Sequence, residues 1–308
     1  MLISRNDLHN TNNDTGSSIT IVIPAKNEAH NLTDLLPALI DSVPPETEII
    51  VVDDGSTDST VEVCGSYPQV RVHSHQYSLG NGAAVKAGAR RGNGDILVFM
   101  DADGQHSPEY VQPLAAKIQE GYDMAVGARQ MKDHASVGRI FANGFYNRLA
   151  SWMTGYQIAD LTSGFRAVRA DKFRRFLYLL PNKFSYPTTS TMAFFRSGYS
   201  VVYIPIRVHP RGGKSHIRLL QDGLRFFVII LKIGALFSPM RLFLPISGSL
   251  FVMGACYYVY TYFSAGRFTN MSALLLIAAI ITFLIGIVSE QISALHYKDT
   301  ESYDAKTD

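Results

Sequence analysis

The stretch GDILVFMDADG, residues 94–104, is an apolar run that ends in two carboxylates separated by one residue. Two earlier runs have a similar form. SITIVIPA at 18–25 ends next to a proline, and TEIIVVDDGSTDST at 47–60 passes from apolar residues into acids, glycine and serine. Continuous apolar runs of this length are typical of strands that are buried on both faces of a sheet. We therefore expect three buried strands here, each followed by polar residues.

Segments with a helical pattern lie between and after these runs. Apolar residues recur at helical intervals in 27–43, and 80–92 is rich in alanine. Two further apolar runs occupy 123–129 and 199–208. Strands that alternate with helices predict an α/β fold made of βαβ units around a parallel sheet. Because ligands bind beyond the carboxyl ends of the strands in such sheets, the polar segments 24–28, 53–58 and 101–105 are expected to form one site.

Asp101 and Asp103 project to the same side if the chain is still extended there. Two carboxylates this close repel each other unless a proton or a cation lies between them. Mg²⁺ prefers oxygen ligands and is usually held by one or two carboxylates together with substrate phosphates. The pair is therefore a candidate metal–diphosphate site, and Gln105 has the parity to join it. The alternative is a tight turn in DADG, in which Asp and Gly serve only the backbone geometry.

Composition limits the remaining possibilities. The 308 residues suffice for one large or two modest domains, and a net charge of +2 gives no general basis for binding nucleic acid. Residues 1–17 are polar and lack the apolar core of a secretion signal, so we expect a flexible leader. The two cysteines, Cys64 and Cys256, lie in regions of different character, and no disulfide between them is expected.

Two stretches near the C-terminus, 242–263 and 271–289, contain no charged residue. At about 1.5 Å per residue, each can cross a hydrocarbon core about 30 Å thick. We therefore expect two transmembrane helices within 241–294; the alternative is a pair of buried core helices. Basic residues are more frequent before the first span than between the spans, which predicts that the large N-terminal domain is cytoplasmic. Two spans then return the tail, 295–308, to the same side.

The region 217–240 joins the two parts. Arg218, Arg225 and Lys232 are spaced seven residues apart and share one face of a helix, while phenylalanine, isoleucine and leucine supply apolar bulk. A basic and aromatic amphipathic helix is typical of the membrane interface. The alternative is a core helix with exposed basic residues.

Four segments in this order resemble a known family: IPAKNEAHNL at 23–32, VVDDGSTDST at 51–60, MDADGQHSP at 100–108 and DLTSGFRAVR at 160–169. They are similar to the family 2 glycosyltransferases. More narrowly, they resemble the polyprenyl-phosphate glycosyltransferases, which include the dolichyl-phosphate mannose synthases. The resemblance covers about residues 18–216. It implies the GT-A fold, a Rossmann-like, mixed and mostly parallel sheet flanked by helices.

The resemblance also implies two substrates, a nucleotide-diphosphate sugar and a membrane polyprenyl phosphate, and a metal ion, Mg²⁺ or Mn²⁺. The residues that it assigns to the nucleotide sugar are Pro24, Ala25, Glu28, Val52, Asp54, Asp101, Ala102, Arg211 and Lys214. Those that it assigns to the metal are Asp101, Asp103 and Gln105, and those for the acceptor phosphate are Arg129, Arg139 and Asn143. Asp103, Arg129 and Arg139 are the residues expected to act in catalysis. Lys26 stands where many relatives have a tyrosine.

The implied reaction is the inverting transfer of a hexose, from a donor of the GDP-mannose or UDP-glucose type, to a polyprenyl phosphate. A hydroxyl acceptor would need a carboxylate base, for which Asp160 is the candidate in this region. A phosphate acceptor needs none, because its second pKa is about 6. The alternatives are a family 2 enzyme that acts on a lipid or saccharide hydroxyl and a catalytically silent membrane scaffold that binds sugar nucleotides. A homo-oligomer formed through the transmembrane helices is a further expectation.

Overall fold

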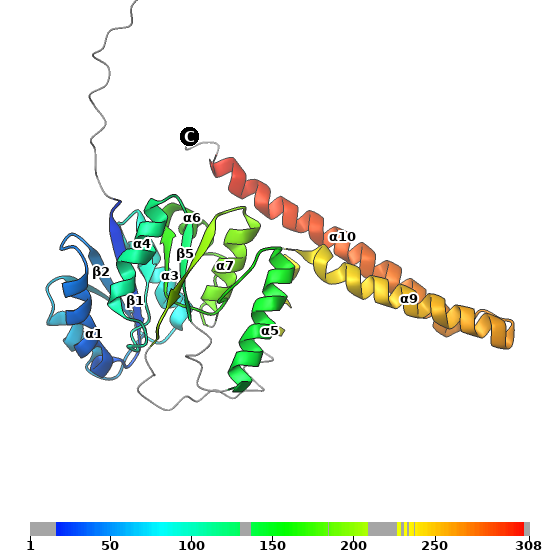
Figure 1. Cartoon of the computed structure of the whole chain (residues 1–308), viewed down its shortest axis with the longest axis horizontal. Coiled ribbons are helices and arrows are strands. Elements are labelled where there is room, and N and C mark those ends of the chain that lie inside the picture. Colours follow the sequence, from blue (N-terminus) through cyan, green and yellow to red (C-terminus); the bar gives the residue numbers. More distant parts are fainter. Residues whose placement is uncertain are drawn as a thin grey trace, which may run out of the picture.

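The structure, a computed structural model, describes residues 17–129, 137–183, 185–208, 227–228, 231–232, 234–236 and 238–304. A seven-stranded sheet forms the centre of the N-terminal domain, with helices on both faces (Figure 1). In spatial order the strands are β3 (Val70–Ser74), β2 (Glu48–Asp53), β1 (Ile19–Ala25), β4 (Ile96–Phe99), β6 (Arg166–Arg169), β5 (Met124–Arg129) and β7 (Val201–Ile206).

The apolar runs become strands because both faces of the sheet are covered. Successive residues of β1 alternate, so Ile21 and Ile23 pack in one core layer and Val22 packs in the other. All four residues of β4 are buried in the same way. The prediction of an α/β domain with buried strands is confirmed.

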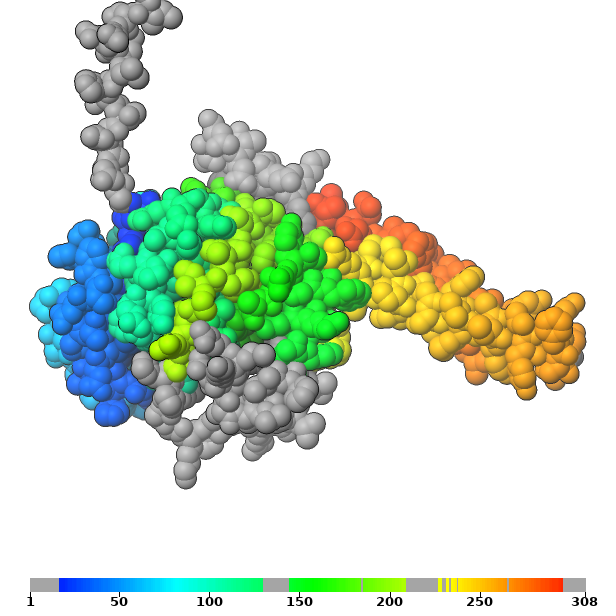
Figure 2. Space-filling view, viewed as in Figure 1, coloured from blue at the N-terminus to red at the C-terminus, as the bar shows by residue number. Residues whose placement is uncertain are grey.

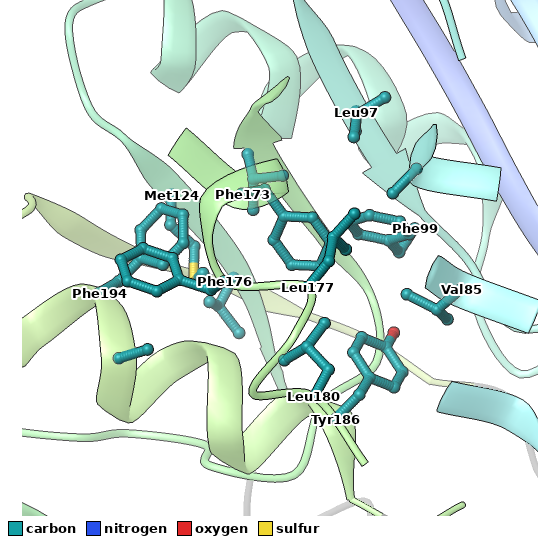
Figure 3. Close-up of a cluster of buried hydrophobic side chains, with 14 of the residues drawn as sticks. Val85, Leu97, Phe99, Met124, Phe173, Phe176, Leu177, Leu180, Tyr186 and Phe194 are labelled. Carbon is teal, nitrogen blue, oxygen red and sulfur yellow. The ribbon is translucent and has the colours of Figure 1, made fainter. Parts of the chain in front are cut away.

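One core layer lies between the sheet and the helices α1 (Ala29–Ser42) and α4 (Val111–Gln119), the latter preceded by the short 3₁₀ helix η1 (Pro108–Tyr110). The helix α2 (Thr60–Gly65) follows β2. The other layer contains α3 (Asn81–Arg91), α6 (Ala170–Arg175) and α7 (Tyr186–Arg196), and α5 (Val137–Thr154) packs on the same side. Figure 3 shows this second layer, in which the Phe99 and Phe173 rings are 4.7 Å apart.

Two strands were not anticipated from the sequence. The strand β3 at the sheet edge contains alternating polar residues and has no apolar run. The strand β6 lies inside the segment DLTSGFRAVR and pairs antiparallel with both β4 and β5, whereas the other strand pairs are parallel. The sheet is therefore mixed and mostly parallel, as the GT-A fold requires.

The C-terminal part is a hairpin of two long helices, α9 (Pro239–Ala265) and α10 (Asn270–Asp304). Both are long and apolar enough to cross a membrane, and only 11% and 17% of their most apolar windows are buried. This exposure argues against a pair of core helices and indicates membrane attachment. The space-filling view shows the hairpin projecting from the globular domain (Figure 2). The helix α10 continues through most of the predicted tail, as far as Asp304.

Most of the region between the domain and the hairpin lies outside the described residues, including Arg218 and Arg225. The described part is helical at 227–228, 231–232 and 234–236, and Lys232 is exposed. The leader, apart from Ser17, also lies outside the described residues.

Candidate active site

A cavity of about 370 Å³ lies at the carboxyl ends of β1, β2 and β4. The polar segments that follow these strands meet there, which confirms that the three strand ends converge. The residues that line it are Pro24, Ala25, Lys26, Glu28, Asp54, Ser78, Gly80, Asn81, Ala84, Asp101, Ala102 and Asp103.

Asp54 holds one wall of this cavity in place. Its Oδ1 accepts hydrogen bonds from His75 Nδ1 and the Leu79 amide, each at 2.8 Å. Its Oδ2 accepts from Ser78 Oγ at 2.7 Å and from the Gly80 amide at 2.8 Å. Burial raises the pKa of Asp54, but these hydrogen bonds outweigh burial and hold it below its usual range. A carboxylate with four donors is ionised and fixes the loop 75–80 beside the cavity.

The segment after β1 is fixed by the loop that follows β2. Asn27 adopts a left-handed backbone conformation, with φ 56°, and its Oδ1 accepts a hydrogen bond from the Thr57 amide at 2.8 Å. The Glu28 amide donates to Thr60 Oγ1 at 3.0 Å. These bonds turn the chain sharply into α1 and leave the Glu28 side chain at the cavity.

Asp101 and Asp103 both line the cavity, while Ala102 between them is buried. The Asp101 carboxylate lies directly against Gly164. A β-carbon at position 164 would be 2.7 Å from Asp101 Oδ2, so the carboxylate occupies space that any side chain would need. The backbone N–H of Gln105 donates a hydrogen bond to Asp103 Oδ1 at 3.2 Å. Gln105 is not among the residues that line the cavity.

The two carboxylates fit a hard divalent cation in the donor atoms that they offer. Among the described residues, no group of three or more His, Cys, Asp or Glu side chains is placed to hold a metal ion. Mg²⁺ commonly binds through one or two carboxylates and completes its coordination with substrate phosphates and water. Asp101 and Asp103 thus fit a metal that is shared with a diphosphate, and Gln105 as a third ligand stays a prediction.

Arg129, at the end of β5, forms a bidentate ion pair with Asp160. Its Nε donates to Asp160 Oδ2 at 2.8 Å and its Nη2 to Oδ1 at 3.0 Å. Asp160 also accepts from the amides of Thr162 and Ser163. Burial raises the pKa of Asp160, but the hydrogen bonds and the charge of Arg129 outweigh burial and keep it low. A carboxylate held in this way is a poor proton acceptor, so its geometry favours orienting Arg129 over acting as a base.

The remaining predicted site residues are placed less fully. Val52 is completely buried in the core and does not line the cavity. Arg139 and Asn143 lie in α5, but their side chains are outside the described residues. Arg211 and Lys214 are also outside the described residues.

Sequence reasoning missed several residues at the site. Ser78, Gly80, Asn81 and Ala84 line the cavity because the loop 75–80 and the start of α3 reach it. Their position along the chain could have indicated this, because the segment YSLG at 77–80 follows the edge strand β3 just as the acids follow β2 and β4. Gly164 was seen only as part of a motif, and nothing in its sequence context indicates contact with Asp101.

The sequence matches two known protein families. Residues 20–177 match the profile of Glycosyl transferase family 2, and 238–295 match the GtrB C-terminal hairpin. A polyprenol monophosphomannose synthase from Mycolicibacterium smegmatis is 33% identical over 60% of this chain and 75% of its own length. An undecaprenyl-phosphate mannosyltransferase from Micrococcus luteus is 32% identical over 61% and 82%.

A solved structure shares the fold at low sequence identity. It is the glucosyl-3-phosphoglycerate synthase from Mycobacterium tuberculosis, in complex with Mn²⁺, uridine diphosphate and glucosyl-3-phosphoglycerate. It superposes with a TM-score of 0.58 at 19% identity and covers 71% of this chain and 80% of that one.

The mixed sheet, with an acidic cavity at its strand ends, defines a glycosyltransferase of the GT-A class. The chain belongs to glycosyltransferase family 2 and carries the C-terminal hairpin of the GtrB type.

Proposed function

We propose that this protein transfers a hexose, with inversion, from a nucleotide-diphosphate sugar of the GDP-mannose or UDP-glucose type to a membrane polyprenyl phosphate. The observation that carries the proposal is that Asp101 and Asp103 line one cavity, while the segment 160–166 contacts Asp101 through Gly164 and holds Arg129 through Asp160. The two relatives, a polyprenol monophosphomannose synthase and an undecaprenyl-phosphate mannosyltransferase, support this choice of acceptor.

The donor side uses the acidic cavity. Pro24, Ala25, Glu28 and Ala102 provide its walls, and Asp54 holds the loop that closes it. Asp101 and Asp103 would hold Mg²⁺ or Mn²⁺, with Gln105 in support. When bound, this ion neutralises charge on the nucleoside diphosphate leaving group. Arg211 and Lys214 remain proposed contacts to the same diphosphate.

The acceptor side uses Arg129, Arg139 and Asn143. A phosphate monoester is largely ionised at neutral pH, because its second pKa is about 6, and needs no general base. This agrees with the state of Asp160, whose oxygens are occupied by Arg129 and backbone amides. Arg129 would orient the acceptor phosphate for a single displacement at the anomeric carbon.

The hairpin gives the acceptor a route to the site. A polyprenyl chain stays in the bilayer, so an enzyme that uses it gains from being attached there. We place the globular domain on the cytoplasmic side, because basic residues concentrate before α9. Arg218, Arg225 and Lys232 would then lie at the membrane surface.

The test is a transfer assay on the purified full chain in detergent, with polyprenyl phosphate, Mn²⁺ and either GDP-mannose or UDP-glucose. We expect a polyprenyl-phosphate hexose, detected by mass spectrometry, with one of these donors. Asp101→Ala and Asp103→Ala should each lower the rate by about a hundredfold or more. Asp95→Ala is the matched control, because Asp95 precedes β4 at the opposite end of the strand and bonds Ser18.

Each alternative has its own result. Transfer to polyprenol but not to polyprenyl phosphate would indicate a hydroxyl acceptor. Binding of nucleotide sugars without any transfer would indicate a silent scaffold. Full activity of both aspartate variants would overturn the metal site.

A further inference from the structure

Arg166, the first residue of β6, is fully buried. Its Nη1 donates to Pro187 O at 3.0 Å, Ser190 Oγ at 2.8 Å and Thr191 Oγ1 at 3.0 Å. Its Nη2 donates to Ser163 O. Among the described residues, no carboxylate pairs with it. A buried cation without a counter-ion in contact is costly, so a purely structural position would favour an apolar side chain.

Arg166 works together with Tyr186, the first residue of α7. The guanidinium carbon of Arg166 lies 5.8 Å from the centre of the Tyr186 ring. The Tyr186 hydroxyl donates to Gly164 O at 2.9 Å, while Arg166 takes the preceding carbonyl, Ser163 O. Tyr186 itself is fixed in the core layer of Figure 3, edge-on to Phe99. Two consecutive carbonyls are thus held by two buried donors.

The segment that they hold connects Asp101, which lines the cavity, with Arg129, which is proposed to bind the acceptor. Gly164 lies against the Asp101 carboxylate, since a β-carbon there would be 2.7 Å from Oδ2 and 3.3 Å from Cγ. A few residues earlier, Asp160 accepts from the Ser163 amide and holds Arg129. The path from Asp101 through 164 and 160 to Arg129 is therefore continuous.

We propose that Arg166 and Tyr186 are positioning residues, which hold the peptide at Gly164 as a backstop that sets the orientation of the Asp101 carboxylate toward the metal–diphosphate. The same segment keeps Asp101 at a set separation from Arg129. The inference rests on the proposed function, because it assumes that Asp101 is a metal ligand. Groups that orient metal ligands typically change metal affinity by about ten- to a hundredfold when they are removed.

Two variants act on the backstop without removing any ligand. Tyr186→Phe deletes one hydroxyl and keeps the ring that packs on Phe99. Gly164→Ala adds a methyl group where the Asp101 carboxylate lies, and the backbone at 164 tolerates alanine because its φ is not in the left-handed region. Tyr199→Phe is the matched control, because the half-buried Tyr199 ring packs against Phe176 and Phe194 of the same core layer and its hydroxyl bonds none of the described residues.

The measurement is calorimetric binding of UDP and, separately, GDP to the full chain in detergent, across a Mn²⁺ titration and without metal. We expect Tyr186→Phe to raise the Mn²⁺ concentration needed for half-maximal nucleotide binding by about tenfold, and Gly164→Ala by at least as much. In Tyr186→Phe and Gly164→Ala, the affinity for nucleotide without metal should stay within about twofold of wild type. In Tyr199→Phe, both this affinity and the Mn²⁺ requirement should stay within about twofold of wild type. A role in folding alone would lower the melting temperature and leave the Mn²⁺ requirement unchanged.

Arg166→Gln and Arg166→Lys extend the test to the cation. The glutamine variant should show the same raised Mn²⁺ requirement, and the lysine variant should recover part of it. If Arg166→Gln does not fold, the other two variants still decide. An unchanged Mn²⁺ requirement in both Tyr186→Phe and Gly164→Ala would overturn the inference.

These outcomes are separable from failure of the proposed function. If wild type binds nucleotide with Mn²⁺ but transfers no sugar, the acceptor assignment fails, and the binding data still judge the positioning role. If wild type shows no Mn²⁺-dependent binding of either nucleotide, the metal site and this inference fail together.

Discussion

Asp160 is the residue whose role changes most between sequence and structure. In the sequence it is the candidate base for a hydroxyl acceptor. In the structure its oxygens accept from the Arg129 guanidinium and from backbone amides. The residue is 6% exposed, so little of it faces solvent or a substrate.

Asp160→Asn separates the two roles. A positioning residue should give about a tenfold rise in the KM for polyprenyl phosphate, because Arg129 loses its ion pair, with an unchanged pH profile of kcat. Loss of a general base would instead lower kcat by about a hundred- to ten-thousandfold and remove its ionisation from the profile. Initial-rate assays between pH 5.5 and 8.5 distinguish these outcomes, and a flat profile with collapsed kcat would contradict the positioning role.

Acid stability follows from three buried carboxylates with lowered pKa values, Asp54, Asp123 and Asp160. Burial raises each pKa, but hydrogen bonds outweigh it; Asp123, for example, is bonded by Lys172 at 2.6 Å and by Ser200. A lowered folded-state pKa contributes stability above the unfolded value, 3.8, and that stability is lost as the pH falls through the folded value.

Burial also lowers the pKa of His106 to about 4, so its contribution to stability is lost as the pH falls from about 6.5 to 4. We therefore expect a melting temperature that declines gradually from about pH 6.5 and falls steeply below about pH 4, where the carboxylates are protonated. Asp123→Asn should lower stability at pH 7 and reduce the further loss on acidification. Scanning calorimetry of the full chain at several pH values checks both. Equal acid sensitivity of wild type and variant would show that Asp123 carries none of the effect.

At the level of helices and strands, α3 packs unusually close to β1. A β-carbon at Gly88 would lie 2.2 Å from Val22 Cγ1, and Val22 is completely buried. The alanine-rich composition of 80–92 predicts a helix because alanine has a high helix propensity. The small side chains in the same stretch also permit this close approach. Small residues let the helix come near the middle of β1.

Gly88→Ala should be destabilising even though alanine favours a helix by about 1 kcal/mol. Overpacking a tight core costs typically about 1–3 kcal/mol, and the contact at Val22 is closer than any such atom pair tolerates. Gly65→Ala at the end of α2 is the control, because no atom lies within 4 Å of its β-carbon position. Urea unfolding should show a loss for the first variant and no loss for the second, and equal midpoints would contradict the close packing.

In the molecule as a whole, a few polar contacts join the globular domain to the hairpin. Arg241, near the start of α9, donates from Nη1 to Trp152 O at 2.8 Å, at the end of α5. Ser293 of α10 donates to Leu236 O at 2.7 Å. These contacts fix the direction in which the hairpin leaves the domain, visible in Figure 1.

Arg241→Ala should raise the KM for polyprenyl phosphate by about fivefold and leave the KM for the nucleotide sugar unchanged. The lost hydrogen bond contributes about 1 kcal/mol and orients the domain toward the bilayer, but it does not touch the cavity. Arg267→Ala, in the turn between α9 and α10, is the control on the same hairpin. Kinetics in bilayer nanodiscs test this, and equal acceptor KM values for both variants would contradict it.

Much of the fold and part of the candidate site could be predicted from local patterns. The apolar runs at 18–25, 47–53 and 94–100 predict buried strands because a sheet covered on both faces needs them. The acids that end them predict a polar site because parallel strands end at one edge. The two charge-free runs predict the helices of the hairpin because the length and hydropathy of each run are enough to identify a membrane-spanning helix.

Contacts between distant segments could not be read in this way. The antiparallel strand β6 begins and ends with an arginine, and one of these, Arg166, is fully buried. The ion pair between Arg129 and Asp160 and the contact between Gly164 and Asp101 join residues far apart in the chain. Periodicity encodes which side chains are buried, whereas the partner of each polar group depends on how the strands are ordered. That ordering exists only once the sheet has assembled.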